Sequence, residues 1–358
     1  MEHTVATEHG RRPGPSSTLG LRLLSLDGGG VRGLSSLMIL QQLMATIDPE
    51  SPPKPCDCFD MIAGTSTGGL IAIMLGRLQM TVDECINAYA SLSSKVFQQK
   101  ARRVKLNGKF QGRFDSAELE LAVKQIILDR GLNEDTLLKD SPDAPCKVYV
   151  CRTVPMIYAN ALSFVCTTSK VTGDIVCLTS YRSPRLGTHL FDSTKIWQAC
   201  RATSAATTFF DPIDVGPFKE KFVDGALGAN NPINILWNQA QDVWGDQLWG
   251  RLRCLVSIGT GLPTLTPVRD DLLGIWSTLR KLATETEKTA EQFRRDKSIL
   301  DDEGRYVRFN VDHGLEHIGL EESAKKSEIA AATGRYIASQ AVVKQMEACA
   351  ANLKEQEC

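Results

Sequence analysis

The chain has 358 residues, of which 42% are hydrophobic and 23% charged, and its formal net charge is −1. This composition is ordinary for a globular protein with a sizeable core. A near-neutral chain has no global field that attracts nucleic acid, so nucleic acid is not expected as a partner. No run approaches the ~20 apolar residues of a membrane span, so we expect membrane contact only at the periphery.

Cysteine usage favours a reducing compartment. The eleven cysteines are scattered, and several lie in apolar runs, where they pack as small core residues. The N-terminus lacks the apolar segment that secretion requires. We therefore expect a cytoplasmic protein with peripheral membrane association. The sequence contains no zinc-type ligand cluster and no calcium loop, so we expect neither a metal nor a cofactor.

The first part of the chain alternates between strands and helices. Residues 1–19 are polar and rich in Gly and Pro, which predicts a disordered tail. The run 21–26 predicts a buried strand, stopped by an aspartate and three glycines, and a helix follows over about 33–46. A second apolar run, 59–63, precedes a glycine-rich turn and the helix-forming run 70–75.

The alternation continues through the middle of the chain. Further helices are expected over about 81–97 and 117–127 and from about 193 and 232, and further strands over 147–154, 162–168, 222–224 and 252–258. This pattern predicts an α/β fold with a mainly parallel central sheet and helices on both faces. We expect residues 20–262 to form this core. Residues 263–358 are expected to be mostly helical, with an amphipathic helix from Ile329 to Met346, and to pack on the same domain.

The turn Gly64-Thr65-Ser66-Thr67-Gly68-Gly69 has the layout of a nucleophile elbow, with a serine at the apex of a strand-to-helix turn. A serine held there has strained backbone angles and leaves no room for side chains two residues to either side. Gly64 and Gly68 would provide that room. An ordinary glycine-rich loop is the alternative.

The first glycine cluster, 27–33, allows two interpretations. Gly28, Gly30 and Gly33 satisfy the dinucleotide-binding fingerprint. That interpretation requires an acid at the end of a second strand about 20 residues further on. The acid found there, Asp48, is expected at a helix end, which disfavours dinucleotide binding.

The other interpretation is an oxyanion hole. Consecutive glycines free their backbone N–H groups towards an anion, and Gly28, Gly29 and Gly30 would face Ser66 if their strand neighbours the elbow strand. Arg32 would brace this loop, contact a phosphate or form a structural salt bridge.

A nucleophilic serine needs a base, and the histidines provide no clear candidate. Two lie in the N-terminal tail and three in polar contexts without a motif: His3, His9, His189, His313 and His317. Asp224 is the better candidate, because it ends a short strand and precedes Gly225 in a turn that exposes its carboxylate. A carboxylate is a weak base for an alcohol, so it must be held close to the serine in a dry pocket. A simple turn aspartate is the alternative.

Three motifs, in this order, resemble those of the patatin-like phospholipase family. They are Leu-Asp-Gly-Gly-Gly-Val-Arg-Gly-Leu over 26–34, the elbow over 64–69, and Asp-Gly-Ala over 224–226. The blocks 201–206, 209–210, 230–232 and 257–261 also look like that family's. The resemblance extends over roughly 21–261 and is greatest to the calcium-independent phospholipase branch.

The resemblance implies a patatin-like fold and a Ser–Asp dyad in place of a triad. Ser66 would be the nucleophile and Asp224 the proton acceptor. The oxyanion hole would be formed by Gly28, Gly29 and Gly30. The supporting motif positions would be Arg32, Gly33, Gly64, Gly68 and Gly225. The implied reaction is calcium-independent hydrolysis of fatty-acyl esters of phospholipids or other acyl lipids at a membrane surface. Such modules often occur in longer proteins, so other domains or an activator are further candidate partners.

A basic segment indicates where the membrane would be contacted. Between Lys95 and Arg113 the chain has seven Lys or Arg and no acid, interleaved with Phe97, Leu106, Phe110 and Phe114. Cations near an anionic membrane contribute ~1 kcal/mol each. We predict a mobile lid or membrane-docking loop that uses Lys100, Arg102, Arg103 and Lys105; a solvated loop is the alternative.

Two functions from other classes remain. One is a dinucleotide-binding oxidoreductase, and the other is a non-catalytic lipid-binding or interaction module that works through the amphipathic C-terminal helix. A serine peptidase with the same elbow is disfavoured, because no histidine is placed to protonate an amine leaving group.

Overall fold

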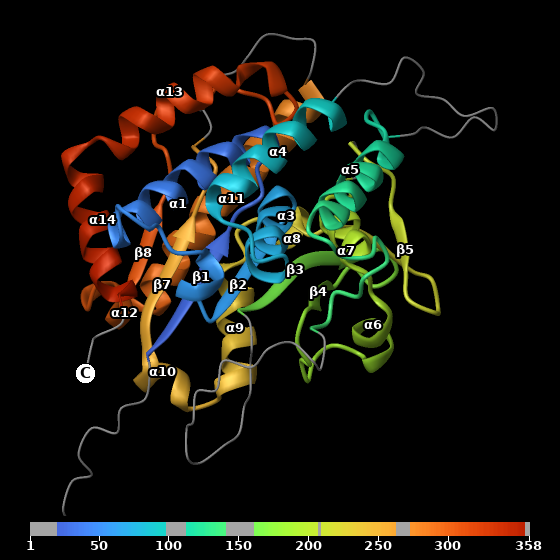
Figure 1. The fold of residues 1–358 in the computed structure, drawn as a ribbon, viewed down its shortest axis with the longest axis horizontal. Coiled ribbons are helices and arrows are strands. Elements are labelled where there is room, and N and C mark those ends of the chain that lie inside the picture. The colour runs from blue at the N-terminus through green and yellow to red at the C-terminus, as the bar shows by residue number, and fades with distance from the viewer. Residues whose placement is uncertain (1–19, 98–111, 141–160, 207–208, 263–272, 355–358) are drawn as a thin grey trace, which may run out of the picture.

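The computed structural model describes residues 20–97, 112–140, 161–206, 209–262 and 273–354 (Figure 1). The thin grey segments of Figure 1 lie outside this description. They contain the predicted tail, the strand predicted over 147–154 and the predicted lipid-contacting residues Lys100, Arg102, Arg103 and Lys105.

A single sheet forms the centre of the described chain (Figure 1). Its strands are β1 (Leu21–Leu26), β2 (Met61–Thr65), β3 (Leu162–Ser169), β4 (Ile175–Thr179), β5 (Ile213–Val215), β6 (Glu220–Asp224), β7 (Leu252–Ile258) and β8 (Tyr306–Phe309). Strands β3, β2, β1, β7 and β8 lie side by side and are parallel. Strands β4 and β6 run antiparallel to β3, and β5 forms a hairpin with β6.

The helices cover both faces of this sheet. They are α1 (Gly33–Ile47), α2 (Pro55–Cys58), α3 (Thr67–Ala72), α4 (Val82–Val96), α5 (Ser116–Asp129), α6 (Thr188–Ser193), α7 (Ile196–Thr203), α8 (Ala226–Ala229), α9 (Ile233–Trp244), α10 (Gln247–Arg251), α11 (Leu273–Asp296), α12 (Ser298–Asp302), α13 (Lys326–Ile337) and α14 (Gln340–Leu353). Figure 1 shows α13 and α14 packed beside α1, while α9 lies across the sheet from them.

Strand β1 explains the two-sided packing. All six of its residues are buried, and successive side chains point to opposite faces of a strand. Leu24 and Leu26 join the hydrophobic core beneath α1, α3 and α4, whereas Leu21 and Leu23 join the core beneath α9 and α12. A fully apolar strand of this kind is typical of a parallel sheet buried on both faces.

The predicted α/β fold with a mainly parallel sheet is confirmed, with two corrections in the C-terminal part. Strand β8 was not predicted, because its four residues form too short a run to stand out from the helices around it. The amphipathic helix predicted from Ile329 to Met346 is two helices, α13 and α14, and Val343 is 40% exposed rather than packed.

No helix in the described ranges combines the length and the apolar character needed to cross a lipid bilayer.

Candidate active site

Ser66 lies between β2 and α3 at the carboxyl edge of the sheet, in a strained turn. Its φ and ψ are 54° and −125°, outside the regions that residues with a side chain normally occupy. A Cβ atom on Gly64 would lie 2.0 Å from the carbonyl oxygen of Gly68, and one on Gly68 would lie 2.3 Å from that of Leu26. Both positions therefore require glycine, for the steric reason that the sequence predicted.

The pairing of β3 explains how Asp224 reaches this turn. Strands β2 and β4 pair with some of the same residues of β3, so they must lie on opposite sides of β3. Strands β4 and β6 also pair with some of the same residues of β3, so they too lie on opposite sides. Strand β6 therefore lies on the same side of β3 as β2. On that side, Thr65 pairs with Cys166 and Asp224 pairs with the next residue, Thr167. The C-terminal ends of β2 and β6 therefore meet end to end, which places Ser66 beside Asp224.

Asp224 is buried, with 3% of its surface exposed. Burial raises the pKa of its carboxyl to about 7, although hydrogen bonds from the Ser66 side chain and the Ala226 backbone lower it. The Ala226 N–H donates to the carboxylate at 2.8 Å. Gly225 is needed between them, because a Cβ there would lie 2.6 Å from the carbonyl oxygen of Cys166.

The described histidines do not contribute to the cavity at Ser66. His189, His313 and His317 are all exposed, and none lines the cavity at Ser66. His3 and His9 lie outside the described residues.

The glycine-rich loop after β1 lies next to the elbow, because β1 and β2 are adjacent parallel strands. The Gly28 N–H donates to the carbonyl oxygen of Asn230 at 3.0 Å, and the Gly29 N–H donates to Thr67 Oγ1 at 3.1 Å. Among the residues that the structure describes, none accepts a hydrogen bond from the Gly30 N–H. Gly30 also lines the same cavity as Ser66.

Other contacts hold Gly30 in its conformation. Its φ is +55°, and a Cβ on it would lie 2.2 Å from the carbonyl oxygen of Leu320. Its own carbonyl oxygen accepts a hydrogen bond from the Tyr89 hydroxyl of α4. The same hydroxyl would lie 2.9 Å from a Cβ on Gly33, so this glycine makes room for Tyr89.

Arg32 is buried, with 6% of its surface exposed. Burial lowers the pKa of its guanidinium to about 10, and its Nε atom has no hydrogen-bond partner. No carboxylate of the described residues forms an ion pair with it, so the structural salt bridge considered for Arg32 is not found there.

An apolar cavity extends from the elbow. Besides Gly30 and Ser66, its wall includes side chains from α4, α5 and the segment after α7: Leu92, Val96, Leu119, Phe209 and Phe210. The described neighbourhood of Ser66 thus joins a serine hydroxyl, a buried carboxylate and an apolar cavity.

Sequence reasoning did not assign the residues that hold the elbow in place. Thr203, at the end of α7, accepts a hydrogen bond from the Ser66 N–H at 2.9 Å and donates to the carbonyl oxygen of Cys166 at 2.8 Å. Asn230 and Thr67 hold the glycine-rich loop in a similar way. Thr203 and Asn230 belong to the blocks 201–206 and 230–232, which resemble those of the family. The sequence therefore pointed to these two residues, but it did not indicate what they do.

Two residues at the C-terminal end of the basic segment, Arg113 and Phe114, are buried. Arg113 is 8% exposed and forms an ion pair with Glu321 at 2.9 Å, and Phe114 is fully buried against Phe97 and Phe209. The prediction of membrane contact is therefore wrong for these two residues, because tertiary packing covers them.

Comparison with known proteins adds an independent line of evidence. Residues 24–237 match the sequence model of a family described as patatin-like phospholipase. The chain is 31% identical to phospholipase A I of Arabidopsis thaliana over 286 residues, which are 68% of this chain and 21% of that protein. It is 30% identical to calcium-independent phospholipase A2-gamma of Mus musculus over 320 residues, which are 86% of this chain and 37% of that protein.

The matched regions are thus only a part of these two relatives, 21% and 37% of their lengths. Among solved structures, VipD from Legionella pneumophila matches over 90% of this chain and 67% of its own, with 11% identity and a TM-score of 0.37.

Proposed function

The chain belongs to the patatin-like phospholipase family, and on that premise we propose that it hydrolyses fatty-acyl esters of phospholipids or other acyl lipids through an acyl-serine intermediate. The position of Ser66 beside the buried Asp224, next to an apolar cavity, carries this proposal. Catalysis by a dyad agrees with the position of the described histidines, none of which lines the cavity.

In the first step, the Ser66 Oγ attacks the acyl carbonyl carbon while its proton passes to the Asp224 carboxylate. An ordinary carboxylate is a weak base for an alcohol, and the efficiency of a general base increases as its pKa approaches the working pH. Burial raises the pKa of Asp224 to about 7, so this carboxylate is a stronger base than an exposed one and is still substantially ionised at neutral pH.

The oxyanion that forms on the former carbonyl oxygen needs preorganised donors. The Gly30 N–H is the best candidate among the three predicted glycines, because those of Gly28 and Gly29 already donate to Asn230 and Thr67. A single donor of this kind typically contributes ~100- to 1,000-fold in turnover. Within this proposal, the hole is therefore centred on Gly30, and Gly28 and Gly29 shape the loop.

The intermediate then collapses, its C–O ester bond breaks, and the protonated Asp224 returns its proton to the leaving alcohol. Water attacks the acyl-enzyme while Asp224 accepts one of its protons, and the second collapse releases the fatty acid and reprotonates Ser66. The apolar wall formed by Leu92, Val96 and Phe210 suits the acyl chain, because it buries hydrocarbon without an unmatched polar group.

The reaction so described uses only side chains and backbone groups of the chain, so we propose that it is independent of calcium. We also propose that the enzyme works at the cytoplasmic surface of a membrane. Lys100, Arg102, Arg103 and Lys105 would supply contacts to anionic lipid. Replacing these four by Gln should weaken binding to anionic liposomes and leave hydrolysis of a small soluble ester unchanged; an equal loss of both would contradict this role.

The decisive experiment measures fatty-acid release from mixed phospholipid vesicles in excess EDTA, for the wild type, Ser66→Ala and Asp224→Ala. We expect release by the wild type that survives chelation and disappears in both variants, whose folding is checked by circular dichroism. A wild type that binds vesicles without releasing fatty acid would support the rival non-catalytic lipid-binding module. Release that persists in Ser66→Ala would exclude the proposed nucleophile.

A further inference from the structure

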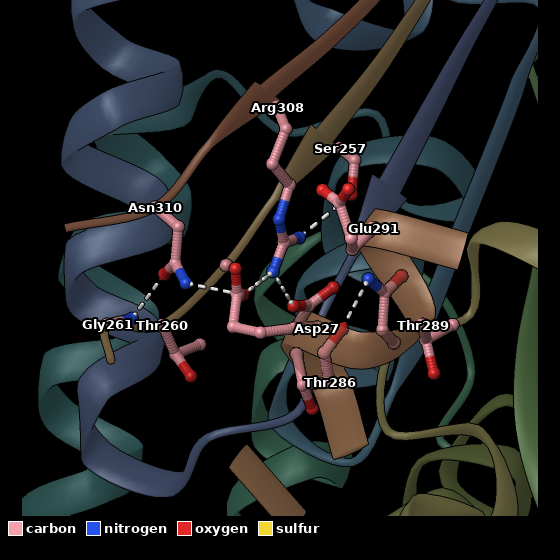
Figure 2. A network of polar contacts seen from close by, with 12 residues as sticks. Asp27, Ser257, Thr260, Gly261, Thr286, Thr289, Glu291, Arg308 and Asn310 are labelled. Carbon is pink, nitrogen blue, oxygen red and sulfur yellow. Dashed lines mark hydrogen bonds and ion pairs between the residues drawn. The ribbon is translucent and has the colours of Figure 1, made fainter. Parts of the chain in front are cut away.

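A second polar cluster adjoins the glycine-rich loop at Asp27 (Figure 2). Its centre is Asp27, which directly precedes Gly28. The Asp27 side chain is 1% exposed. Arg308 of β8 reaches Asp27 across β7: its Nη2 lies 2.6 Å from Asp27 Oδ2, and its Nη1 donates to Ser257 Oγ at 2.8 Å. Burial raises the pKa of Asp27 to about 6, and Arg308 keeps it below the value that burial alone would produce.

Helix α11 closes the cluster from the other side. Glu287 Oε1 lies 2.8 Å from the same Arg308 nitrogen and also accepts a hydrogen bond from Asn310 Nδ2 at 2.7 Å. Asn310 in turn accepts a hydrogen bond from the Gly261 N–H at 2.6 Å, as Figure 2 shows. The cluster thus joins β1, β7, β8 and α11 through one buried guanidinium.

Thr286, the residue before Glu287, is linked to the same loop through Asn230. Thr286 Oγ1 accepts a hydrogen bond from Asn230 Nδ2 at 2.8 Å, and the same Nδ2 donates to the carbonyl oxygen of Gly28 at 3.2 Å. Thr260 Oγ1 also donates to that oxygen, at 3.1 Å. Adjacent residues of α11 are therefore linked to the loop through Arg308 at Asp27 and through Asn230 at Gly28.

A merely stabilising role does not account well for this arrangement. A buried ion pair gains little net stability, because desolvation of the charges offsets their attraction, and well-packed apolar side chains would serve as well. What such a network provides is a fixed geometry. An oxyanion donor acts only if its position is set before the reaction, and a misplacement of about 1 Å costs roughly 100-fold in rate.

We propose that Arg308, held by Glu287 of α11, is a positioning residue that sets the Asp27–Gly30 backbone and so aims the Gly30 N–H at the oxyanion. This inference rests on the function proposed above and extends it to the part of the chain after 262. Arg308 of β8 and Glu287 of α11 thereby support the active site, although neither touches the substrate.

The test compares Arg308→Met, Arg308→Lys and Glu287→Gln with the matched control Glu285→Gln, an exposed position on the same helix. Hydrolysis of a soluble p-nitrophenyl ester gives kcat and KM, and the rate of Ser66 labelling by a fluorophosphonate reports on the same oxyanion contacts. Thermal melting measures the folded fraction of each variant.

We expect Arg308→Met to lower kcat and the labelling rate about 10- to 100-fold, with KM changed less than about twofold. Arg308→Lys should recover part of the loss, because a single ammonium can contact Asp27 but not Asp27, Glu287 and Ser257 together. Glu287→Gln keeps the shape of the side chain and should cost about 5-fold, while Glu285→Gln should match the wild type.

Folded Arg308→Lys and Glu287→Gln proteins with unchanged kcat and labelling would overturn this inference alone, whether or not Arg308→Met folds. A kcat that falls only in proportion to the folded fraction would overturn it as well. A wild type that neither hydrolyses the ester nor reacts with the fluorophosphonate would instead refute the proposed function, and this inference with it.

Discussion

Two buried aspartates lie at the same edge of the sheet, on the two sides of the elbow, and their surroundings differ. Asp224 has a hydroxyl and a backbone N–H as partners, and no cation among the described residues forms an ion pair with it. Asp27 is paired with Arg308, and Glu287 shares the guanidinium. Burial raises both pKa values, to about 7 and about 6.

The difference shows how one residue type serves two purposes. A carboxylate without a cation keeps its affinity for a proton and can act as a base, whereas one clamped by a guanidinium is held in place and is less free to take a proton. Asp224 is therefore suited to proton transfer and Asp27 to anchoring the loop.

The largest effect is expected when each aspartate is replaced by asparagine, which tests whether Asp224 and Asp27 have different roles. Asp224→Asn should lower kcat by about 10²- to 10⁴-fold, because a general base is lost. Asp27→Asn should lower it only about 10-fold, because the loop loosens but the base remains. Steady-state kinetics on a soluble ester measure both, and equal losses would contradict the division of roles.

The next largest effect is expected at the proposed oxyanion donor. Gly30→Ala places a Cβ against Leu320 at a positive φ, so the loop must move and kcat should fall about 10²- to 10³-fold. Gly131→Ala is the matched control, because Gly131 also has a positive φ, 72°, but has open space around it. The control should lose roughly 1 kcal/mol of stability and no activity; similar activity losses in both variants would argue against the Gly30 donor.

The pH profile offers a test without mutation. Asp224 works as a base only when ionised, so kcat/KM should rise with pH and level off above its pKa of about 7, falling about tenfold per pH unit well below it. The rate of a soluble ester between pH 5 and pH 9 gives this curve. A profile that is flat through pH 7 would show that another group takes the proton.

A smaller effect on kcat is expected at Thr203, which holds the elbow in place. Thr203→Val removes the acceptor of the Ser66 N–H while keeping the shape of the side chain, and we expect kcat to fall about 10-fold. Thr203→Ser retains the hydroxyl and serves as the control. Unchanged activity in the valine variant would mean that the strained turn holds its position without this contact.

The last prediction concerns stability. The pKa of Asp224 is raised from 3.8 to about 7 on folding, so the fold loses stability as pH rises through this interval and the loss is complete above it. Asp224→Asn removes this cost and should stabilise the protein by roughly 4 kcal/mol at pH 8, with the gain vanishing near pH 4. Thermal melts at both pH values check this. The pKa of Asp27 is raised less, to about 6, because Arg308 offsets part of the cost of burial, so Asp27→Asn should stabilise the protein less than Asp224→Asn at pH 8.

Local sequence patterns predicted the parts of the site that depend on local geometry. Gly64 and Gly68 flank a serine because any Cβ there meets backbone within 2.3 Å, and this requirement is visible in the spacing of the glycines. The apolar runs of β1 and β7 were predicted for a similar reason, since strands buried on both faces cannot include exposed polar positions. The short strand β8 and the separation of α13 from α14 had no comparably strong local signal.

By itself, the sequence determined the elbow, the glycine-rich loop and the alternation of strands and helices, because steric limits and hydrophobic periodicity act over a few residues. Only the tertiary structure decided that β6 meets β2 end to end, so that Asp224 faces Ser66, and that Arg308 of β8 crosses β7 to reach Asp27. Strand order and the register between distant segments determine such encounters. These depend on the packing of the whole chain, so no short stretch of it specifies them.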